Sequence, residues 1–206
     1  AANGMDAFTQ LLESFVSTRS NPLTDPLARS GLQAAMDGLL AWHAGGEGAA
    51  AGREGMAYAS LLSGICLAHT GLGSVHGLAQ PLGSFFPIAH GVVCGTLLAS
   101  ATRVNVEALR EREPDSPALA KYAEVGRMLA GDDRLDADAA RAALLTTLED
   151  WTRQLRLPSL TALGVLHADC ERIGAHSRGS SMKTNPIVLT DEEIRQILLP
   201  RLDEAA

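Results

Sequence analysis

Residues 73–91 read GSVHGLAQPLGSFFPIAHG, and the rest of the chain is interpreted outward from this stretch. It carries two histidines, His76 and His90, among residues that are mostly glycine, proline or apolar. Histidines in such surroundings are expected in a pocket, where imidazole can bind a metal or move a proton. From their spacing (90 − 76 = 14) alone, metal ligands and polar residues satisfied within a core are equally good interpretations. A zinc finger is excluded, because no cysteine pair completes one.

The flanking sequence predicts an all-α, multi-helix bundle. Apolar residues make up 46% of the 206 positions, and alanine and leucine dominate over β-branched and aromatic residues, which favours helix. Helical periodicity and capping signals place helices over residues 4–17, 24–43, 53–70, 74–80, 90–109, 116–129, 136–155 and 167–173, with a last helix opening at the capping box of Thr190. Residues 45–52 are expected to form a flexible connection, and Pro81 to end the short helix that carries His76.

No alternating strand pattern and no internal repeat is present, so residues 1–206 are interpreted as a single helical domain. The polar segment 111–117 is the only plausible internal boundary.

Composition excludes several function classes. The formal charge of −7 and the lack of any basic run argue against nucleic acid as a partner. No uninterrupted apolar run reaches the ~18 residues of a membrane span. The N-terminal sequence AANGMDAF has no signal-peptide pattern, and the three cysteines form no CxxC pair. We therefore expect a reduced, cytoplasmic protein without a membrane partner, with a homo-oligomer left open.

The first predicted helix is amphipathic. Its apolar stripe runs from Met5 to Val16, and the opposite face holds Asp6, Thr9, Gln10 and Glu13. Taken alone, this polar face is expected to be solvated. By contrast, the helix over 53–70 is apolar nearly all round and is expected to be buried on most sides.

The remaining histidines in polar surroundings are expected at the surface: His43, His167 and His176.

Several blocks resemble a known family in order and spacing. They are MDAFTQLLESFVSTRSNPLTDPLA from Met5, MAYASLLSGICLAHTGLGSVHGLAQPLGSFFPIAHGVVCGTLL from Met56, then KYAEVGRML, LRLPSLTALGV and MKTNPIVLTDEEI. Together they span essentially the whole chain, which is similar to the C-terminal helical domain of the iron-containing (group III) alcohol dehydrogenases, of the dehydroquinate synthase-like fold. In that family an N-terminal α/β domain binds NAD(P), the helical domain holds a divalent metal, and the active site lies between them. Nothing in this chain resembles the cofactor domain.

The resemblance implies a set of site residues. The family binds its metal through one aspartate and three histidines, and these positions correspond to Asp6, Gln10, His76 and His90. Gln10 thus stands where the family has its first histidine, and an amide oxygen is a weaker ligand than imidazole. Gln80 stands at a catalytic position near the nicotinamide, where many members have a histidine, and it cannot titrate.

The implied function is the metal-binding half of an NAD(P)-dependent alcohol dehydrogenase that interconverts a small alcohol and an aldehyde or ketone. Fe²⁺ or Zn²⁺ would act as a Lewis acid on the substrate oxygen, and NAD(P) would come from the absent domain, so that the isolated chain is expected to be inactive. Phe85 and Phe86 are candidates for the substrate pocket, with core packing an equally good interpretation.

Two alternatives stay open at this stage. One is a non-catalytic helical assembly domain that has lost its metal. The other is a metal-independent reductase of the same superfamily, similar to the maleylacetate reductases. Gln10 and Gln80 favour these alternatives, whereas Asp6, His76 and His90 argue against them.

Overall fold

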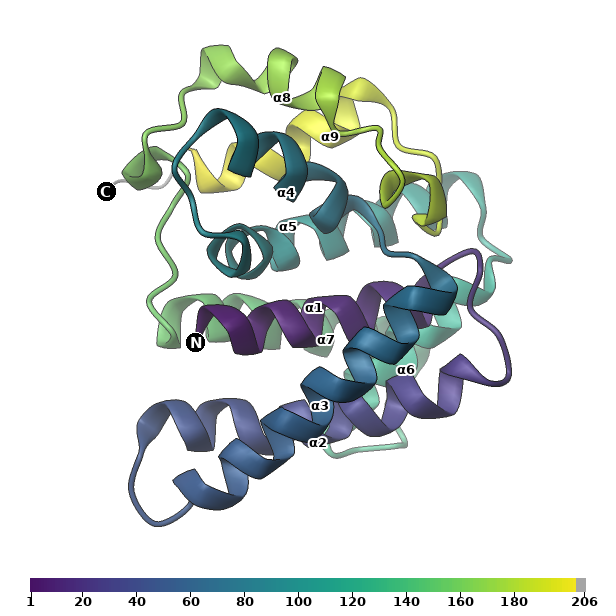
Figure 1. Ribbon diagram of the computed structural model, residues 1–206. Helices are drawn as coiled ribbons and strands as arrows, with labels where there is room; N and C mark the ends of the chain where they lie inside the picture. The colour runs from purple at the N-terminus through teal and green to yellow at the C-terminus, as the bar shows by residue number, and fades with distance from the viewer. Residues whose placement is uncertain (203–206) are drawn as a thin grey trace.

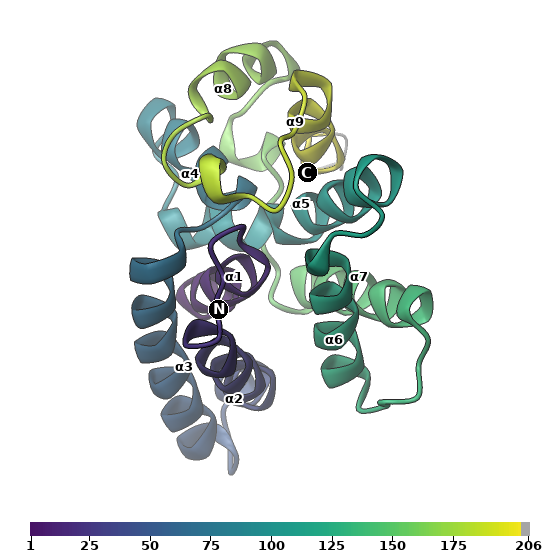
Figure 2. The same cartoon turned by 90° about the vertical axis from the view of Figure 1, so that its right-hand side faces the viewer.

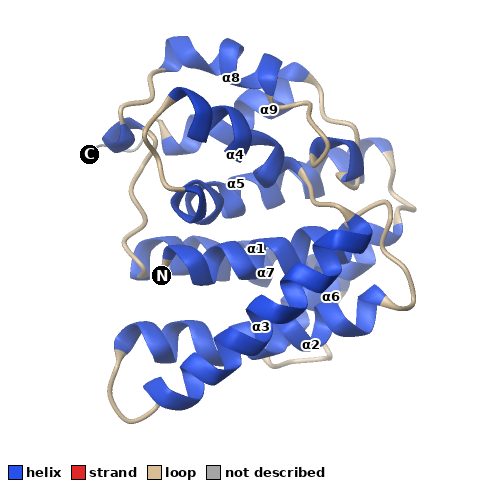
Figure 3. Cartoon of the chain, in the orientation of Figure 1, coloured by secondary structure: helices blue, strands red, loops and turns tan. Residues whose placement is uncertain are grey.

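A computed structural model describes residues 1–202, and within them the chain is helical with no strand. This confirms the predicted all-α bundle (Figure 3). The α-helices are α1 (Ala2–Val16), α2 (Thr24–Ala44), α3 (Ala49–Thr70), α4 (Ser74–Phe85), α5 (His90–Arg112), α6 (Pro117–Ala130), α7 (Ala137–Gln154), α8 (Cys170–His176) and α9 (Asp191–Leu198). Short 3₁₀ turns link the later elements.

Helix α1 lies at the centre of the bundle. It packs against α2 and α3 on one side, α6 on another and α5 above (Figures 1 and 2). A second tier of α4, α5, α8 and α9 lies over it, and α9 contacts α5 while α8 contacts α4. Residues of both tiers therefore contribute to the hydrophobic core.

The central position of α1 overturns the expectation of a solvated polar face. Thr9 is fully buried and Glu13 is 6% exposed, because α3 and α4 cover the face that carries them. A buried carboxylate is costly unless it is paired. The polar residues of this face must therefore find partners inside the protein, and the site described below supplies them.

Helix α3 departs from the sequence analysis in two ways. It begins at Ala49, so half of the expected connection is helical, and α2 and α3 form a long hairpin that projects at the bottom of Figure 1. It is also less buried than its apolar sequence predicted. Leu61 and Ile65 are exposed, and so is Tyr58, whose hydroxyl lies 3.0 Å from that of Ser30 on α2.

The GLG break ends α3 as predicted. Gly71 has φ +66°, a left-handed conformation that glycine adopts without strain, and its N–H caps α3 on the Leu67 carbonyl. The expectation that Pro81 ends α4 was wrong, because the helix continues through Pro81 to Phe85. Proline costs one helical hydrogen bond, and α4 tolerates this loss while Pro81 and Leu82 pack into the core.

The C-terminal region closes the upper tier. Thr190 and Glu193 form the predicted capping box at the start of α9. Upstream of it, the buried Asn185 side chain donates to the side-chain oxygen Oδ1 of Asn105 at 2.7 Å and accepts from the Ser74 backbone N–H at 3.0 Å. These bonds fix the start of α4 against α5.

Helix α5 is long and apolar enough to cross a membrane by length and composition. Within the described chain, however, 83% of its most apolar window is buried by protein. A second candidate arises only if α3 and α4, bent by 99°, are taken as one span. This degree of burial is typical of a central helix in a helical bundle.

Helices α6 and α7 approach closely at Gly126. A Cβ atom there would overlap the Ala140 carbonyl oxygen, whereas a Cβ at Gly64 of α3 would meet nothing within 4 Å. We expect Gly126→Ala to lower the free energy of unfolding by about 3 kcal/mol through overpacking. Gly64→Ala should raise it by up to about 1 kcal/mol through helix propensity. Urea unfolding of both variants checks this, and equal effects would contradict the α6–α7 packing.

Candidate metal centre

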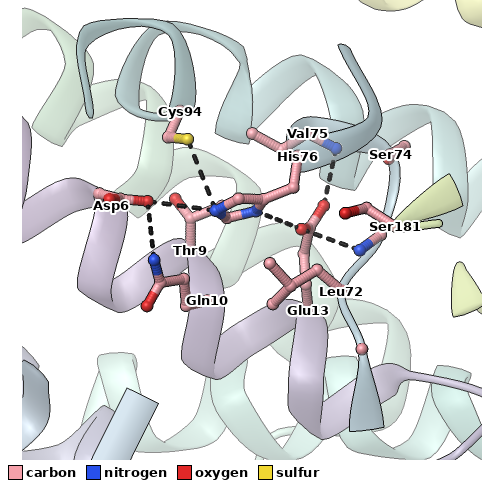
Figure 4. A network of polar contacts seen from close by, with 12 residues as sticks. Asp6, Thr9, Gln10, Glu13, Leu72, Ser74, Val75, His76, Cys94 and Ser181 are labelled. Atoms are coloured by element: carbon pink, nitrogen blue, oxygen red, sulfur yellow. Dashed lines mark hydrogen bonds and ion pairs between the residues drawn. The ribbon is translucent and has the colours of Figure 1, made fainter. Parts of the chain in front are cut away.

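Helix α1 presents three polar side chains on one face. Asp6, Gln10 and Glu13 lie four and seven residues apart, which puts them one above the other over two turns. This face points toward the N-terminal end of α4 (Figure 4). The buried face of α1 is therefore one wall of the site.

Glu13 ties this wall to α4. Its carboxylate accepts hydrogen bonds from the backbone N–H groups of Gly73 at 2.9 Å and Val75 at 2.7 Å. The same carboxylate lies 2.7 Å from Nδ1 of His76 (Figure 4). With Nδ1–H donating to Glu13, the other ring nitrogen, Nε2, is directed at Asp6.

A second wall comes from α5. Glycines face α1 at two positions, where a Cβ on Gly91 would lie 2.8 Å from the Ala2 carbonyl oxygen and one on Gly95 would lie 3.0 Å from the Met5 Cβ. These close contacts let α5 lie near the start of α1. The approach brings His90 and Cys94, one helical turn apart on α5, to the Asp6 carboxylate.

Four potential ligand atoms converge at this point. His76 Nε2 lies 3.2 Å and His90 Nε2 lies 3.7 Å from Asp6 Oδ1. Cys94 Sγ lies 3.7 Å from His76 Nε2 and 3.5 Å from His90 Nε2. One ligand atom from each of the four residues lies within 4.8 Å of every other. The His90 side chain is 55% exposed, whereas His76 and Cys94 are buried, so the cluster opens to solvent on the His90 side.

The charges in the cluster stabilise one another. Burial acts to lower the pKa of His76, but its hydrogen bonds to Asp6, Cys94 and Glu13 outweigh burial and raise the pKa to about 12. Burial acts to raise the pKa of Asp6, but the hydrogen bond to His76 and the charges of His76 and His90 hold it below its usual value. Burial raises the pKa of the Cys94 thiol to about 11, partly offset by His76. Without a metal, His76 is an imidazolium between two carboxylates.

Gln10 lies beside the cluster, as the sequence analysis expected. Its amide nitrogen donates to Asp6 Oδ1 at 3.3 Å, and its amide oxygen accepts from the Ser63 hydroxyl at 2.8 Å. The ligating atom of Gln10 is thus turned away from the cluster (Figure 4). Its assignment as a metal ligand stays a prediction.

The other sequence-based candidates lie outside the cluster. Gln80 is exposed one turn beyond His76 on α4, and a Cβ on Gly179 would lie 2.8 Å from its amide oxygen. Phe85 is partly buried, with the Arg172 guanidinium 4.4 Å from its ring centroid. A catalytic role for Gln80 and a substrate-lining role for Phe85 stay predictions.

The surface positions expected for His43, His167 and His176 are confirmed.

Two residues of the site escaped the sequence analysis. Glu13 was placed on a solvated face, and Cys94 was considered only as one of three cysteines without a CxxC pair. The signal for both was helical spacing: Glu13 lies seven residues after Asp6, and Cys94 lies four residues after His90.

The donor set fits a divalent transition metal. A carboxylate oxygen, two imidazole nitrogens and a sulfur are the ligand types that zinc and iron sites use. The cluster is half-open, as expected where a substrate must reach the ion. Asp6, His76, His90 and Cys94 are therefore the residues of the described chain that could hold one.

Known proteins share this arrangement of sequence and fold. The family profile "Fe-containing alcohol dehydrogenase family, C-terminal" matches residues 1–201. Alcohol dehydrogenase 4 of Saccharomyces cerevisiae is 30% identical over 200 residues, covering 96% of this chain and 49% of the yeast protein. A 1,3-propanediol dehydrogenase of Klebsiella pneumoniae is 36% identical over 170 residues, covering 82% of this chain and 42% of that protein.

A solved structure agrees with these relatives. The crystal structure of a 1,3-propanediol oxidoreductase superposes with a TM-score of 0.86 at 29% identity, covering 98% of this chain and 51% of that chain. The chain thus spans about half the length of the proteins it matches. Matches of this extent in sequence and structure show that the chain belongs to the iron-containing alcohol dehydrogenase family, as a C-terminal helical domain.

Proposed function

We propose that this chain is the metal-binding half of an NAD(P)-dependent alcohol dehydrogenase that interconverts a small alcohol and the corresponding aldehyde or ketone. The observation that carries the proposal is the convergence of Asp6, His76 and His90 from three separate helices. Three donors from distant segments have no packing reason to meet at a half-open cluster. Family membership and the names of the relatives support the same reaction class.

The residues of the chain have distinct tasks in this proposal. Asp6, His76 and His90 hold the ion, and Glu13 keeps His76 in the tautomer that leaves Nε2 free to bind it. The bound Fe²⁺ or Zn²⁺ supplies a Lewis acid that polarises the substrate oxygen. The exposed side of His90 leaves room for a small alcohol to approach.

The nicotinamide has to come from protein outside these residues. No strand or glycine-rich phosphate loop lies in residues 1–202, and the relatives are about twice as long as the matched region. We propose that NAD or NADP binds a separate domain facing the His90 side of the cluster. A cytoplasmic location is part of the proposal as well, whereas the oligomeric state is left open.

Gln10 favours a second candidate, a metal-independent reductase of the same superfamily. The amide replaces a histidine ligand, and its nitrogen faces Asp6. In that case His76 would act only as a charged group between Asp6 and Glu13. Metal content separates the two candidates.

His90→Ala tests the metal site with little risk to the fold, because the side chain is 55% exposed at the first residue of α5. We expect about one Zn²⁺ or Fe²⁺ per wild-type chain after anaerobic loading, and a substoichiometric amount in the variant. His43→Ala, at another exposed histidine, is the matched control and should retain the metal. Elemental analysis with circular dichroism measures both. Equal metal in the wild type and His90→Ala would contradict the ligand assignment, and no metal in either would favour the metal-independent reductase.

Metal affinity should rise with pH. The pKa of His76 is raised to about 12, so at neutral pH an ion binds only by displacing the His76 proton. For each displaced proton the dissociation constant falls about tenfold per pH unit while pH stays below that pKa. Isothermal titration calorimetry between about pH 6 and 8, in buffers of different ionisation enthalpy, counts the protons released. A flat affinity across this range would show that His76 is already neutral.

Activity should depend on protein beyond this chain. We expect no alcohol-dependent reduction of NAD⁺ or NADP⁺ by residues 1–206 alone, because hydride transfer needs a positioned nicotinamide. A longer protein that joins these residues to a nicotinamide-binding domain should show it, and His90→Ala in that protein should lose it. A spectrophotometric assay that follows the absorbance of the reduced nicotinamide measures this activity. Activity of the isolated chain would overturn the division of labour proposed here.

A further inference from the structure

The family's fourth protein ligand, a histidine, has no imidazole counterpart in this chain. Asp6, His76 and His90 provide three ligand atoms, and the fourth family position is occupied by Gln10. Gln10 and Cys94 are the two neighbours with an atom able to complete the set. The structure distinguishes them by what each side chain is already bonded to.

The amide of Gln10 is committed at both ends. Its nitrogen, which has no lone pair for a metal, donates to Asp6, and its oxygen accepts from Ser63 at 2.8 Å. Without an ion between them, rotating the amide by 180° would bring its oxygen against the Asp6 carboxylate, where two acceptors repel. Gln10 is therefore held as a hydrogen-bond donor that orients Asp6.

Cys94 is placed differently. Its Sγ is buried, and the polar contacts that the structure gives it are to His76, His90 and Asp6. When a sulfur and a nitrogen bind one ion at ordinary bond lengths and a near-tetrahedral angle to each other, they lie about 3.5 Å apart. Sγ lies 3.7 Å from His76 Nε2 and 3.5 Å from His90 Nε2. These separations match those of donors that share one ion.

The helix supports the same assignment. His90 and Cys94 are four residues apart on α5, so both side chains project from one face, as two metal ligands on a single helix must. The glycines at 91 and 95 hold this face against α1. Position 94 is thus as firmly directed at Asp6 as position 90.

We infer that Cys94 is the fourth protein ligand of the metal, so that this chain builds an Asp–His–His–Cys site in place of the aspartate and three histidines implied by the resemblance. The inference rests on the proposed function, because it names a ligand of the same ion. A thiolate is a softer donor than imidazole, and sulfur ligation favours Zn²⁺ over Fe²⁺. The site should therefore bind Zn²⁺ more tightly than Fe²⁺.

Cobalt substitution tests the inference by a readout that does not depend on activity. The chain is stripped of metal, reduced without added thiol, and titrated with Co²⁺ under anaerobic conditions. A bound Co²⁺ gives visible ligand-field bands, and only a thiolate ligand adds a sulfur-to-cobalt charge-transfer band in the near ultraviolet. We expect both in the wild type.

Two matched variants locate the sulfur. Cys94→Ser should lose the near-ultraviolet band and bind Zn²⁺ more weakly by at least the 10–100-fold that loss of an outer partner costs. Cys66→Ser removes another buried thiol, whose Sγ lies 3.8 Å from the Thr24 carbonyl oxygen and outside the cluster, and should keep both the band and the affinity. Circular dichroism confirms that each variant folds.

The outcomes separate this inference from the proposed function. Wild-type chain that binds Co²⁺ with visible bands but without the charge-transfer band overturns the role of Cys94 and leaves the metal site standing. This holds even if Cys94→Ser does not fold. Wild-type chain that binds neither Co²⁺ nor Zn²⁺ overturns both.

Discussion

The buried carboxylate of Glu13 is the contact on which the site depends. It joins the central helix α1 to the start of α4 by accepting two backbone N–H groups and lying 2.7 Å from the His76 ring. The N-terminus of a helix offers unpaired N–H groups and a favourable dipole for a negative charge, so Glu13 is stabilised where it would otherwise be costly. Removing one partner from a buried charged pair typically costs about 3–5 kcal/mol. One side chain therefore sets both the packing of α4 and the tautomer of His76.

This constraint explains why the site is built from helices and not from loops. Asp6, Gln10 and Glu13 share one face of α1, so their relative positions follow from helix geometry. His90 and Cys94 are fixed in the same way on α5. The site further requires that α4 and α5 lie close to α1. Glu13 fixes the position of α4 through its hydrogen bonds, and the glycines of α5 allow that helix to approach α1 closely.

Much of this was predictable from the sequence, and what was missed has physical reasons. Helical periodicity located each α-helix, although α3 begins earlier and α4 ends later than expected, and the capping box of Thr190 gave the start of α9. Periodicity could not reveal that α1 lies at the centre, because an amphipathic stripe gives no sign of a second set of neighbours on its polar face. Glu13 was therefore misplaced. Periodicity also could not reveal that Leu61 on α3 is exposed. An apolar side chain stays exposed wherever no other helix packs against it, and the sequence does not show which helices pack together.

Some of the site residues could be predicted from the sequence, and others could be identified only from the structure. His76 and His90 could be suspected from their apolar surroundings, but their equivalence to ligands, and that of Asp6, required the family resemblance. Cys94 was missed because a pattern of known ligands points only to positions that the family uses. Its assignment needs the orientation of the Gln10 amide and the sulfur–nitrogen distances, which exist only in three dimensions.

Gln10 and Cys94 are best understood together. With Gln10 directed at Asp6 as a donor, the carboxylate is oriented but the site is one protein ligand short. A thiolate at Cys94 restores the number of donors and adds a second negative charge beside Asp6, which strengthens the attraction for a divalent cation in a partly buried site. The same charge lowers the effective positive charge of the ion, and so its strength as a Lewis acid. A site of this composition is a weaker Lewis acid but retains a soft metal more tightly, which distinguishes it chemically from the pattern of one aspartate and three histidines without moving any helix.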